Sequence, residues 1–190
     1  MDMEKIKTLE LEGKIIAILA TNGFENVELV LPKRALEEAG ATVHVVSPQA
    51  EKIQGVDHLK WREDFVPVDY TLKEADPDRY DALMLPGGVI NPDLLRLEPS
   101  AIEFIKSFVT SEKPIAAICH GPWTLINANA VTGKKITSWP TLRADLENAG
   151  AIWVDEETAL NGKLLTSRKP DDIPAFNREM ISLFGKTDGE

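Results

Sequence analysis

The amino-acid sequence predicts an α/β protein whose doubly wound, mostly parallel sheet is sandwiched by helices, in a single domain of residues 1–190. Short apolar runs rich in β-branched residues alternate along the chain with segments that have the apolar spacing of helices. No internal repeat, low-complexity segment or linker divides the sequence. The length of 190 residues, with 43% hydrophobic content, is sufficient for one sizeable core.

The first third of the chain predicts a β-α-β unit. A polar leader, residues 1–12, precedes the apolar run KIIAILA at residues 14–20. Residues 27–39 have helical spacing and end at Gly40, which is typical of a helix C-terminus. The β-branched run ATVHVVS at residues 41–47 is the second strand.

The remaining elements continue the alternation after an irregular stretch, residues 48–77, which could be a hairpin or an excursion at the sheet edge. Strands are predicted from apolar or β-branched runs, and helices from amphipathic spacing. In order they are a strand at 81–88 ending in a glycine turn, a helix at 101–111, a strand at 113–119, the segment KKITSW at 134–139, a helix at 141–148 closed by Gly150, a strand-like segment at 151–157, a hairpin across Asn161 and Gly162, and a helix from about Asp172.

Charge and composition limit which kinds of partner the protein can bind and where in the cell we expect it. The formal net charge is -10 and the basic residues are scattered among acids, which argues against nucleic acid or an anionic membrane as a partner. One cysteine cannot form an intrachain disulfide, and no apolar segment approaches the length of a signal peptide core or a membrane span. We therefore expect a cytoplasmic protein.

Several kinds of site lack support in the sequence. Neither a P-loop nor a G-x-G-x-x-G motif is present, and His44, His58 and His120 do not have metal-ligand spacing. The sequence accordingly predicts no cofactor and no metal. An amidotransferase glutaminase would need a histidine downstream of its cysteine, and no histidine follows His120.

Cys119 is the first candidate for chemistry. It ends the apolar run KPIAAIC, and Gly121 and Pro122 follow shortly after it, as expected of a sharp turn from a strand into a helix. Such a turn exposes a nucleophile and directs backbone amides at it, which lowers the pKa of a thiol. A lone cysteine can equally be a small buried core residue.

Glu25 has two readings. Asn22 followed three residues later by Glu25 fits a capping box at a helix start. Alternatively, Glu25 activates Cys119, which would require a protonated carboxyl in a desolvated pocket, because a carboxylate would raise the thiol pKa.

The other candidates are His120, Gly87, Gly88 and Asp93. Only a turn at Cys119 could bring the His120 ring alongside the sulfur, because neighbouring side chains normally point in different directions. Gly87 and Gly88 form a tight turn, where the Gly88 amide and that of His120 could make an oxyanion hole. Asp93 is either a helix cap or a carboxylate that orients a histidine.

The segments TNGFENVEL, DALMLPGG and AICHGP, in this order, resemble the PfpI family of the class I glutamine amidotransferase-like superfamily, which also includes the parkinsonism-associated protein deglycase. The resemblance extends to TSWP and SRKPDD and so covers nearly the whole chain. It implies a flavodoxin-like sandwich with Cys119 as nucleophile, Glu25 as the protonated acid and His120 as the adjacent histidine.

The resemblance also implies a homodimer. In PfpI-like members a carboxylate from the neighbouring subunit orients the histidine, and Asp93 in NPDLLR is the nearest match, although the loop here is one residue longer and others carry Glu.

Family members are described as cysteine peptidases, as glyoxalases or deglycases, and as chaperones or stress proteins. Attack of a thiolate on an α-oxoaldehyde needs only a small pocket, whereas peptide hydrolysis needs a groove for an extended chain. We therefore expect a stress-response enzyme acting on a small carbonyl substrate such as methylglyoxal or its adducts. A PfpI-type peptidase acting on peptides is the second reading, and a redox sensor or holdase based on Cys119 is the third.

Overall fold

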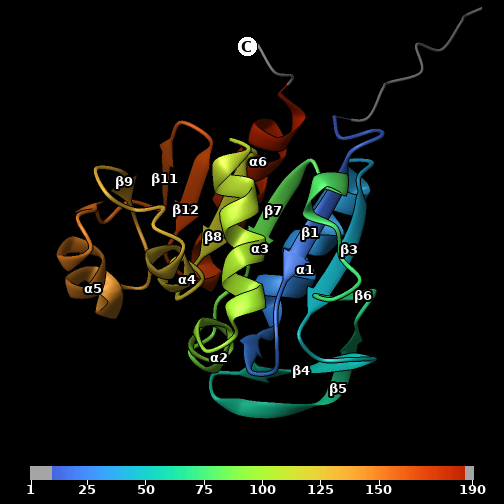
Figure 1. Cartoon of the computed structure of the whole chain (residues 1–190). Helices are drawn as coiled ribbons and strands as arrows, with labels where there is room; N and C mark the ends of the chain where they lie inside the picture. The colour runs from blue at the N-terminus through green and yellow to red at the C-terminus, as the bar shows by residue number, and fades with distance from the viewer. Residues whose placement is uncertain (1–9, 187–190) are drawn as a thin grey trace, which may run out of the picture.

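A seven-stranded sheet runs through the centre of the protein in the computed structural model, which describes residues 10–186 (Figure 1). Its spatial order is β11-β12-β8-β7-β1-β3-β6, and every pair is parallel except the antiparallel hairpin of β11 and β12. The predicted doubly wound, mostly parallel α/β sheet is thus confirmed. In chain order the strands are β1 (Ile15–Leu19), β3 (Thr42–Ser47), β6 (Tyr70–Thr71), β7 (Ala82–Leu85), β8 (Ile115–Ile118), β11 (Thr158–Asn161) and β12 (Leu164–Ser167).

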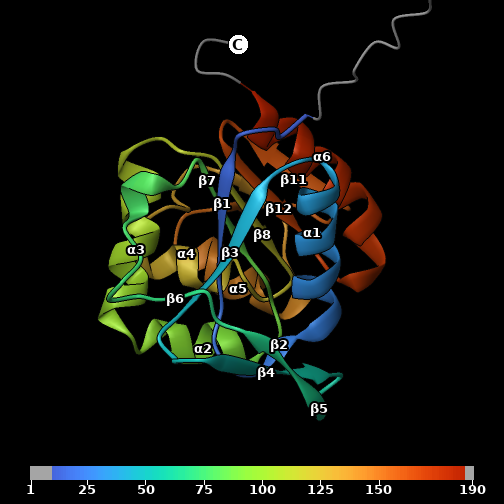
Figure 2. The same cartoon turned by 90° about the vertical axis from the view of Figure 1, so that its right-hand side faces the viewer.

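Helices cover both faces of this sheet. Figure 2 shows α1 and α3 on opposite sides, and α6 packs beside α1. The helices are α1 (Asn26–Glu38), α2 (Ile90–Arg96), α3 (Pro99–Thr110), α4 (Trp123–Asn127), α5 (Arg143–Asn148) and α6 (Ile173–Gly185).

Successive side chains of the interior strand β1 point to opposite faces of the sheet, where they belong to two separate core clusters. Ile16 and Ile18 pack with Phe176 of α6, whereas Ala17 and Leu19 belong to the cluster built around α3. Successive side chains of a strand point to opposite faces, so a fully apolar strand requires a cover on both sides. Burial of each large side chain contributes about 1.5–3 kcal/mol to the free energy of unfolding.

The irregular stretch at 48–77 contains both structures that the sequence left open. β4 (Lys52–Asp57) and β5 (Lys60–Pro67) form a hairpin, and β2 (Phe24–Glu25) joins it in a separate three-stranded sheet. β6 adds to the edge of the main sheet. In Figure 2 the hairpin lies beyond the ends of the central strands, beside the start of α1.

The C-terminal third departs from the expected arrangement in one respect. The predicted strand-like segment at 151–157 contains β10 (Ile152–Trp153), which pairs with β9 (Lys135–Ile136) of the segment 134–139 rather than with the main sheet. The remaining elements are short 3-10 helices: η1 (Pro77–Arg79), η2 (Pro140–Leu142) and η3 (Pro170–Asp172).

Only the end of the predicted leader, residues 1–12, can be compared with the structure, because residues 1–9 lie outside the described part. Leu11 is fully buried in the core, and its amide donates to Ala39 O at 2.9 Å. The end of the leader is therefore part of the folded protein.

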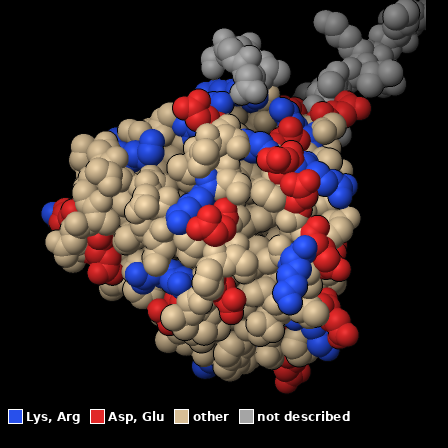
Figure 3. All heavy atoms as spheres, in the orientation of Figure 1, with Lys and Arg blue, Asp and Glu red and all other residues tan. Residues whose placement is uncertain are grey.

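Two surface properties concern possible partners. No helix within residues 10–186 is both long and apolar enough to cross a membrane. On the face shown in Figure 3, acidic and basic side chains are interspersed, without an extended basic patch.

Candidate active site

Cys119 lies on the turn between β8 and α4, as the apolar run ending at this residue indicates. Its φ angle is 62°, in the left-handed region that residues other than glycine rarely adopt. Hydrogen bonds hold both sides of the residue: its amide donates to Ser167 O at 3.0 Å and its carbonyl accepts from Trp139 N at 2.9 Å. The surrounding strands therefore impose the strained conformation, a pattern frequent at active sites.

Glu28 is the acid that contacts Cys119. It lies in the first turn of α1 and is fully buried, and its Oε2, which accepts a hydrogen bond from Gly87 N at 3.1 Å, lies beside Cys119. Burial raises the pKa of Glu28 to about 8, although its interaction with the Cys119 side chain opposes this shift. The carboxyl group is thus predominantly protonated at pH 7 and can donate to the sulfur.

The expectation that Glu25 is this acid is corrected by the structure. Glu25 is the last extended residue before α1, and its Oε2 accepts a hydrogen bond from His58 N at 3.2 Å. Burial raises the pKa of Glu25 as well. Both glutamates face the same cavity, but Glu28 is the one whose carboxyl group interacts with the Cys119 side chain.

The predicted capping box is also absent. Glu25 occupies the N-cap without a side-chain hydrogen bond to the helix, and Asn22 Oδ1 accepts from Gln54 N at 2.8 Å instead. Helical spacing could have identified Glu28, because it shares the buried face of α1 with Pro32 and Leu36, four and eight residues later. An acid on an apolar helix face is unusual unless it is neutral or partnered.

His120 lies beside the sulfur. Its Nδ1 is 3.3 Å from Cys119 Sγ, and its ring stacks on Trp139 with a centroid distance of 5.8 Å. Burial lowers the pKa of His120 to about 4, so the imidazole is neutral at pH 7 and can accept a proton. Trp139 is a site residue that the sequence analysis did not single out.

Opposing effects act on the Cys119 thiol. Burial raises its pKa well above the ordinary value and ionised Glu28 raises it further, whereas backbone hydrogen bonds from Gly88 and His120 lower it. The glycine turn permits this approach: a Cβ on Gly87 would lie 2.6 Å from Cys119 Cβ, and Gly88 has a φ of 78°. The two amides thus converge on the sulfur, but burial outweighs them, so the expectation that this turn lowers the thiol pKa is wrong.

Asp93 is not brought to His120 within one chain. It lies on α2 with an exposed side chain, outside the cavity that contains His120. In the described part of the chain its carboxylate has no hydrogen-bond or ion-pair partner.

The cavity containing these groups has a volume of about 580 Å³. It lies beyond the carboxyl ends of the central strands, where ligands bind in sheets of this type. Residues from the β4–β5 turn, α4 and η2 complete its mainly apolar wall. The lining residues are Glu25, Glu28, Val56, His58, Leu59, Gly88, Val89, Cys119, His120, Trp123, Trp139, Thr141, Leu142, Asp145 and Pro170.

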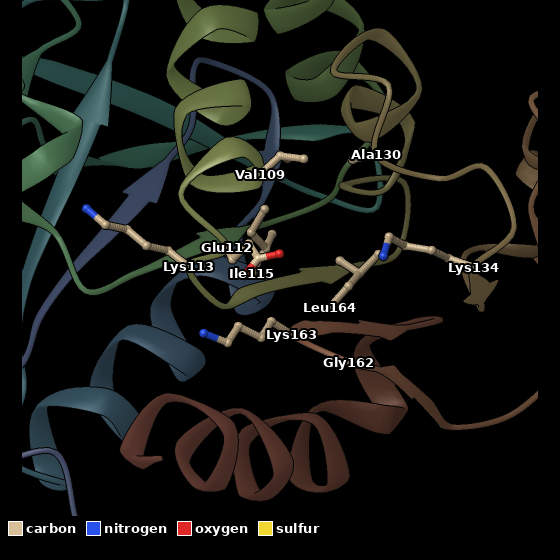
Figure 4. A pocket seen from close by; sticks show the side chains of 9 residues that line it. All are labelled: Val109, Glu112, Lys113, Ile115, Ala130, Lys134, Gly162, Lys163 and Leu164. Carbon is tan, nitrogen blue, oxygen red and sulfur yellow. The ribbon is translucent and has the colours of Figure 1, made fainter. Parts of the chain in front are cut away.

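A second cavity, of about 340 Å³, lies near the amino ends of β8 and β12 (Figure 4). Lys113, Lys134 and Lys163 line it, but their ammonium groups do not converge in this view. Lys113 Nζ donates to Pro77 O at 3.0 Å. This cavity lacks the grouping of reactive side chains found around Cys119.

The sequence of this chain matches the model of the DJ-1/PfpI family over residues 14–183. General stress protein 18 of Bacillus subtilis (strain 168) is 43% identical over 92% of this chain and 99% of its own length. YraA of the same organism, named as a candidate cysteine protease, is 42% identical over 90% of this chain and 98% of its own. Deglycase TK1284 of Thermococcus kodakarensis is 42% identical over 88% and 98%.

A solved structure supports the same relationship. A two-domain protein from Anabaena variabilis, containing dj-1/thij/pfpi-like and ferritin-like domains, superposes with a TM-score of 0.84 and 34% identity. The match covers 90% of this chain and 48% of that one, so this chain spans about half of the two-domain protein. Sequence and fold lead to one assignment: the chain belongs to the DJ-1/PfpI family.

Proposed function

We propose that this protein is a stress-response enzyme that uses Cys119 to convert reactive carbonyls, of the glyoxalase or deglycase type, with methylglyoxal and its adducts as the substrate class. The observation that carries the proposal is the convergence of a protonated acid, two backbone amides and a neutral imidazole on one sulfur. The names of two relatives, General stress protein 18 and Deglycase TK1284, agree with this reading.

The chemistry begins with addition of the Cys119 sulfur to the aldehyde carbon. The thiol proton is released to His120, and the carbonyl oxygen takes up a proton, which gives a hemithioacetal. The amides of Gly88 and His120 can stabilise negative charge on that oxygen while it develops. Glu28, as a neutral acid, stabilises the thiolate before the attack.

Neutral His120 then acts as a proton shuttle. It takes the proton from the former aldehyde carbon and delivers it to the adjacent carbon, which converts the hemithioacetal into a thioester of a 2-hydroxy acid. Water cleaves the thioester, and the thiol is regenerated. With methylglyoxal the net reaction is addition of one water to give lactate.

Peptide hydrolysis is the second candidate, because the name of the relative YraA points to it. The structure of one chain favours a small substrate over a peptide: Cys119 is only 6% exposed and lies in a cavity with apolar walls. A redox sensor would use the same thiol but would change once per molecule, without turnover.

We further propose that the active protein is a homodimer in which Asp93 of one subunit orients His120 of the other. Asp93 is exposed and unpaired in the described part of one chain, and three exposed apolar side chains lie near it in the sequence, Val89, Leu94 and Leu97. Exposed apolar residues grouped around an unpaired carboxylate are expected at an interface. Light scattering of the parent and an Asp93→Asn variant, with lactate formation measured for both, tests this arrangement.

The main test is incubation of the reduced protein with methylglyoxal, with a chiral assay of D- and L-lactate. Cys119→Ala is the control for the nucleophile, and a casein digest assay runs in parallel. Many lactate equivalents per parent molecule and none from Cys119→Ala would support carbonyl chemistry. Absence of lactate from a protein with a titratable thiol would refute it, and Cys119-dependent cleavage of casein would then favour the peptidase.

A further inference from the structure

Three side chains of types that can bind a metal ion lie together where β2 meets the tip of the β4–β5 hairpin. One carboxylate oxygen each of Glu25 and Asp57 and a ring nitrogen of His58 lie within 4.8 Å of one another. The proposed chemistry at Cys119 uses none of these side chains. Glu25 belongs to β2, Asp57 ends β4 and His58 follows it in the hairpin turn; β2 and β4 are adjacent strands of the small sheet.

The unpartnered oxygen of Glu25 is the observation that indicates a bound ligand. The residue is 9% exposed, and its Oε1 is buried without a hydrogen-bond partner in the described structure, whereas its Oε2 accepts from His58 N. A buried carboxylate oxygen normally has a partner, because its desolvation is costly. A carboxylate oxygen of Glu25 belongs to this cluster, so a cation bound there would give the Glu25 carboxylate the partner that it lacks.

The hairpin turn holds the imidazole in place. His58 and Leu59 have φ angles of 48° and 71°, the two positive values of a type I′ turn, which usually carries asparagine and glycine. His58 Nδ1 lies 2.8 Å from Asp57 Oδ1, so these two atoms share a proton that a cation could replace. Both side chains are largely exposed and free to adjust their rotamers.

We propose that Glu25, Asp57 and His58 form a binding site for a divalent transition-metal ion of the Zn²⁺ class. One imidazole nitrogen and two carboxylate oxygens are ligands that Zn²⁺ accepts, and tetrahedral Zn²⁺ requires ligand atoms about 3.3 Å apart. The exposed side chains of Asp57 and His58 reach this separation by small rotations. Three protein ligands leave a coordination position open to water or to a ligand oxygen.

The open position would face the Cys119 cavity, because Glu25 and His58 both line it. A metal ion there would add a Lewis acid to the wall of a cavity whose other reactive groups are a thiol and an imidazole. Metal binding would also be a function of the β4–β5 hairpin that is separate from the reaction at Cys119. The proposal is independent of the reaction proposed above.

The test uses untagged, metal-free protein titrated with Zn²⁺ by calorimetry and with Co²⁺ by visible absorption. The parent and Cys119→Ser are compared with Glu25→Gln, Asp57→Asn and His58→Asn. Asp64→Asn is the matched control, because Asp64 is an exposed carboxylate of the same hairpin that pairs with Arg62 instead. Circular dichroism checks the fold of every variant.

We expect one equivalent of Zn²⁺ per chain in the parent, in Cys119→Ser and in Asp64→Asn. Each of the three ligand variants should bind at least about tenfold more weakly, since removing a ligand costs no less than removing an outer-shell partner. If Glu25→Gln does not fold, the Asp57→Asn and His58→Asn variants test the proposal. Their side chains are exposed, so these substitutions should leave the fold intact.

Three results would overturn the proposal. The first is no binding by the parent at millimolar Zn²⁺, and the second is unchanged affinity in any folded ligand variant. The third is loss of binding in Cys119→Ser, which would place the metal on the thiol.

Discussion

The sulfur of Cys119 lies 3.3 Å from Nδ1 of His120, although the two residues are neighbours in the chain. Adjacent side chains on a regular strand or helix point apart, and the positive φ of Cys119 removes that separation. The same turn directs the His120 amide at the sulfur. One strained residue thus brings both a proton acceptor and a hydrogen-bond donor to the nucleophile.

His120 should remain neutral until the pH approaches 4, because burial disfavours the imidazolium. His58 is exposed and hydrogen-bonded to Asp57, which raises its pKa above the ordinary value. Protonation of His120 favours the unfolded chain, so its contribution to stability is lost as the pH falls from 6.5 through 4. Two-dimensional NMR of ¹⁵N-labelled histidines measures both pKa values, and the chain has only three histidines to assign. A His120 pKa near 6.5 would contradict the buried geometry.

Replacement of Glu28 should change the reactivity of Cys119, and replacement of Glu25 should not. Below pH 8 Glu28 holds a proton that it can donate to the sulfur, so Glu28→Ala should slow alkylation by iodoacetamide at pH 6.5 by about tenfold, one pKa unit. Above pH 8 the ionised carboxylate of the parent opposes the thiolate, and the difference should shrink.

Glu25→Ala is the matched control for this comparison, because Glu25 faces the same cavity and, unlike Glu28, does not interact with the Cys119 side chain. Equal losses of reactivity in the two variants would refute the assignment of Glu28 as the acid.

The protonation of Glu28 should also make the free energy of unfolding depend on pH. Its pKa is about 8 in the folded state against 4.5 as an ordinary glutamate, so the protonated form favours folding. This contribution is complete below pH 4.5 and is lost as the pH rises through 8. Urea unfolding of the parent and Glu28→Gln should therefore diverge between pH 5 and pH 8, on the order of a few kcal/mol. Parallel pH profiles would disprove a buried, protonated Glu28.

Gly87→Ala should abolish the reactivity of Cys119 while leaving most of the sheet intact. The added methyl group would lie 2.6 Å from Cys119 Cβ, 2.8 Å from Ile118 O and against the Glu28 carboxyl, so the residues around the sulfur must shift. Gly133→Ala is the comparison for a glycine away from the cavity, where an added Cβ meets no atom within 4 Å, although the positive φ of Gly133 adds strain there. Alkylation rates, with circular dichroism as a check on folding, distinguish the two positions.

Arg168 should anchor the segment that leads to Pro170 on the cavity wall. Its guanidinium donates to both oxygens of buried Asp172, at 2.8 and 3.0 Å, and to Asp155 at 2.7 Å. Arg168→Ala leaves Asp172 buried without its cation and should lower the free energy of unfolding by about 2 kcal/mol.

The exposed pair of Arg34 and Glu38 provides the control for this measurement. Arg34→Ala should change the free energy of unfolding by less than about 0.5 kcal/mol, because exposed i,i+4 pairs contribute little. Similar losses in the two arginine variants would show that the Arg168 network does not anchor the segment.

Local patterns in the sequence were sufficient to predict the fold class, the strand-to-helix turn at Cys119 and the glycine turn at Gly87 and Gly88. Apolar periodicity depends on which faces of an element are buried, and turns depend on the backbone freedom of a few residues. Both are properties of short segments. These features can therefore be predicted from short segments of the sequence, without knowledge of the rest of the molecule.

The tertiary structure alone decided which glutamate meets Cys119. Glu25 and Glu28 are three residues apart, and the choice depends on where α1 begins and which of its faces lies on the sheet. Packing with α6 and β3 sets that rotation, and it involves contacts remote in sequence. The placement of Trp139 beside His120 and of the Glu25, Asp57 and His58 cluster arises in the same way, because each joins side chains from separate elements. The sequence determined the positions of the turns, whereas the packing of elements against the sheet determined which side chains surround them.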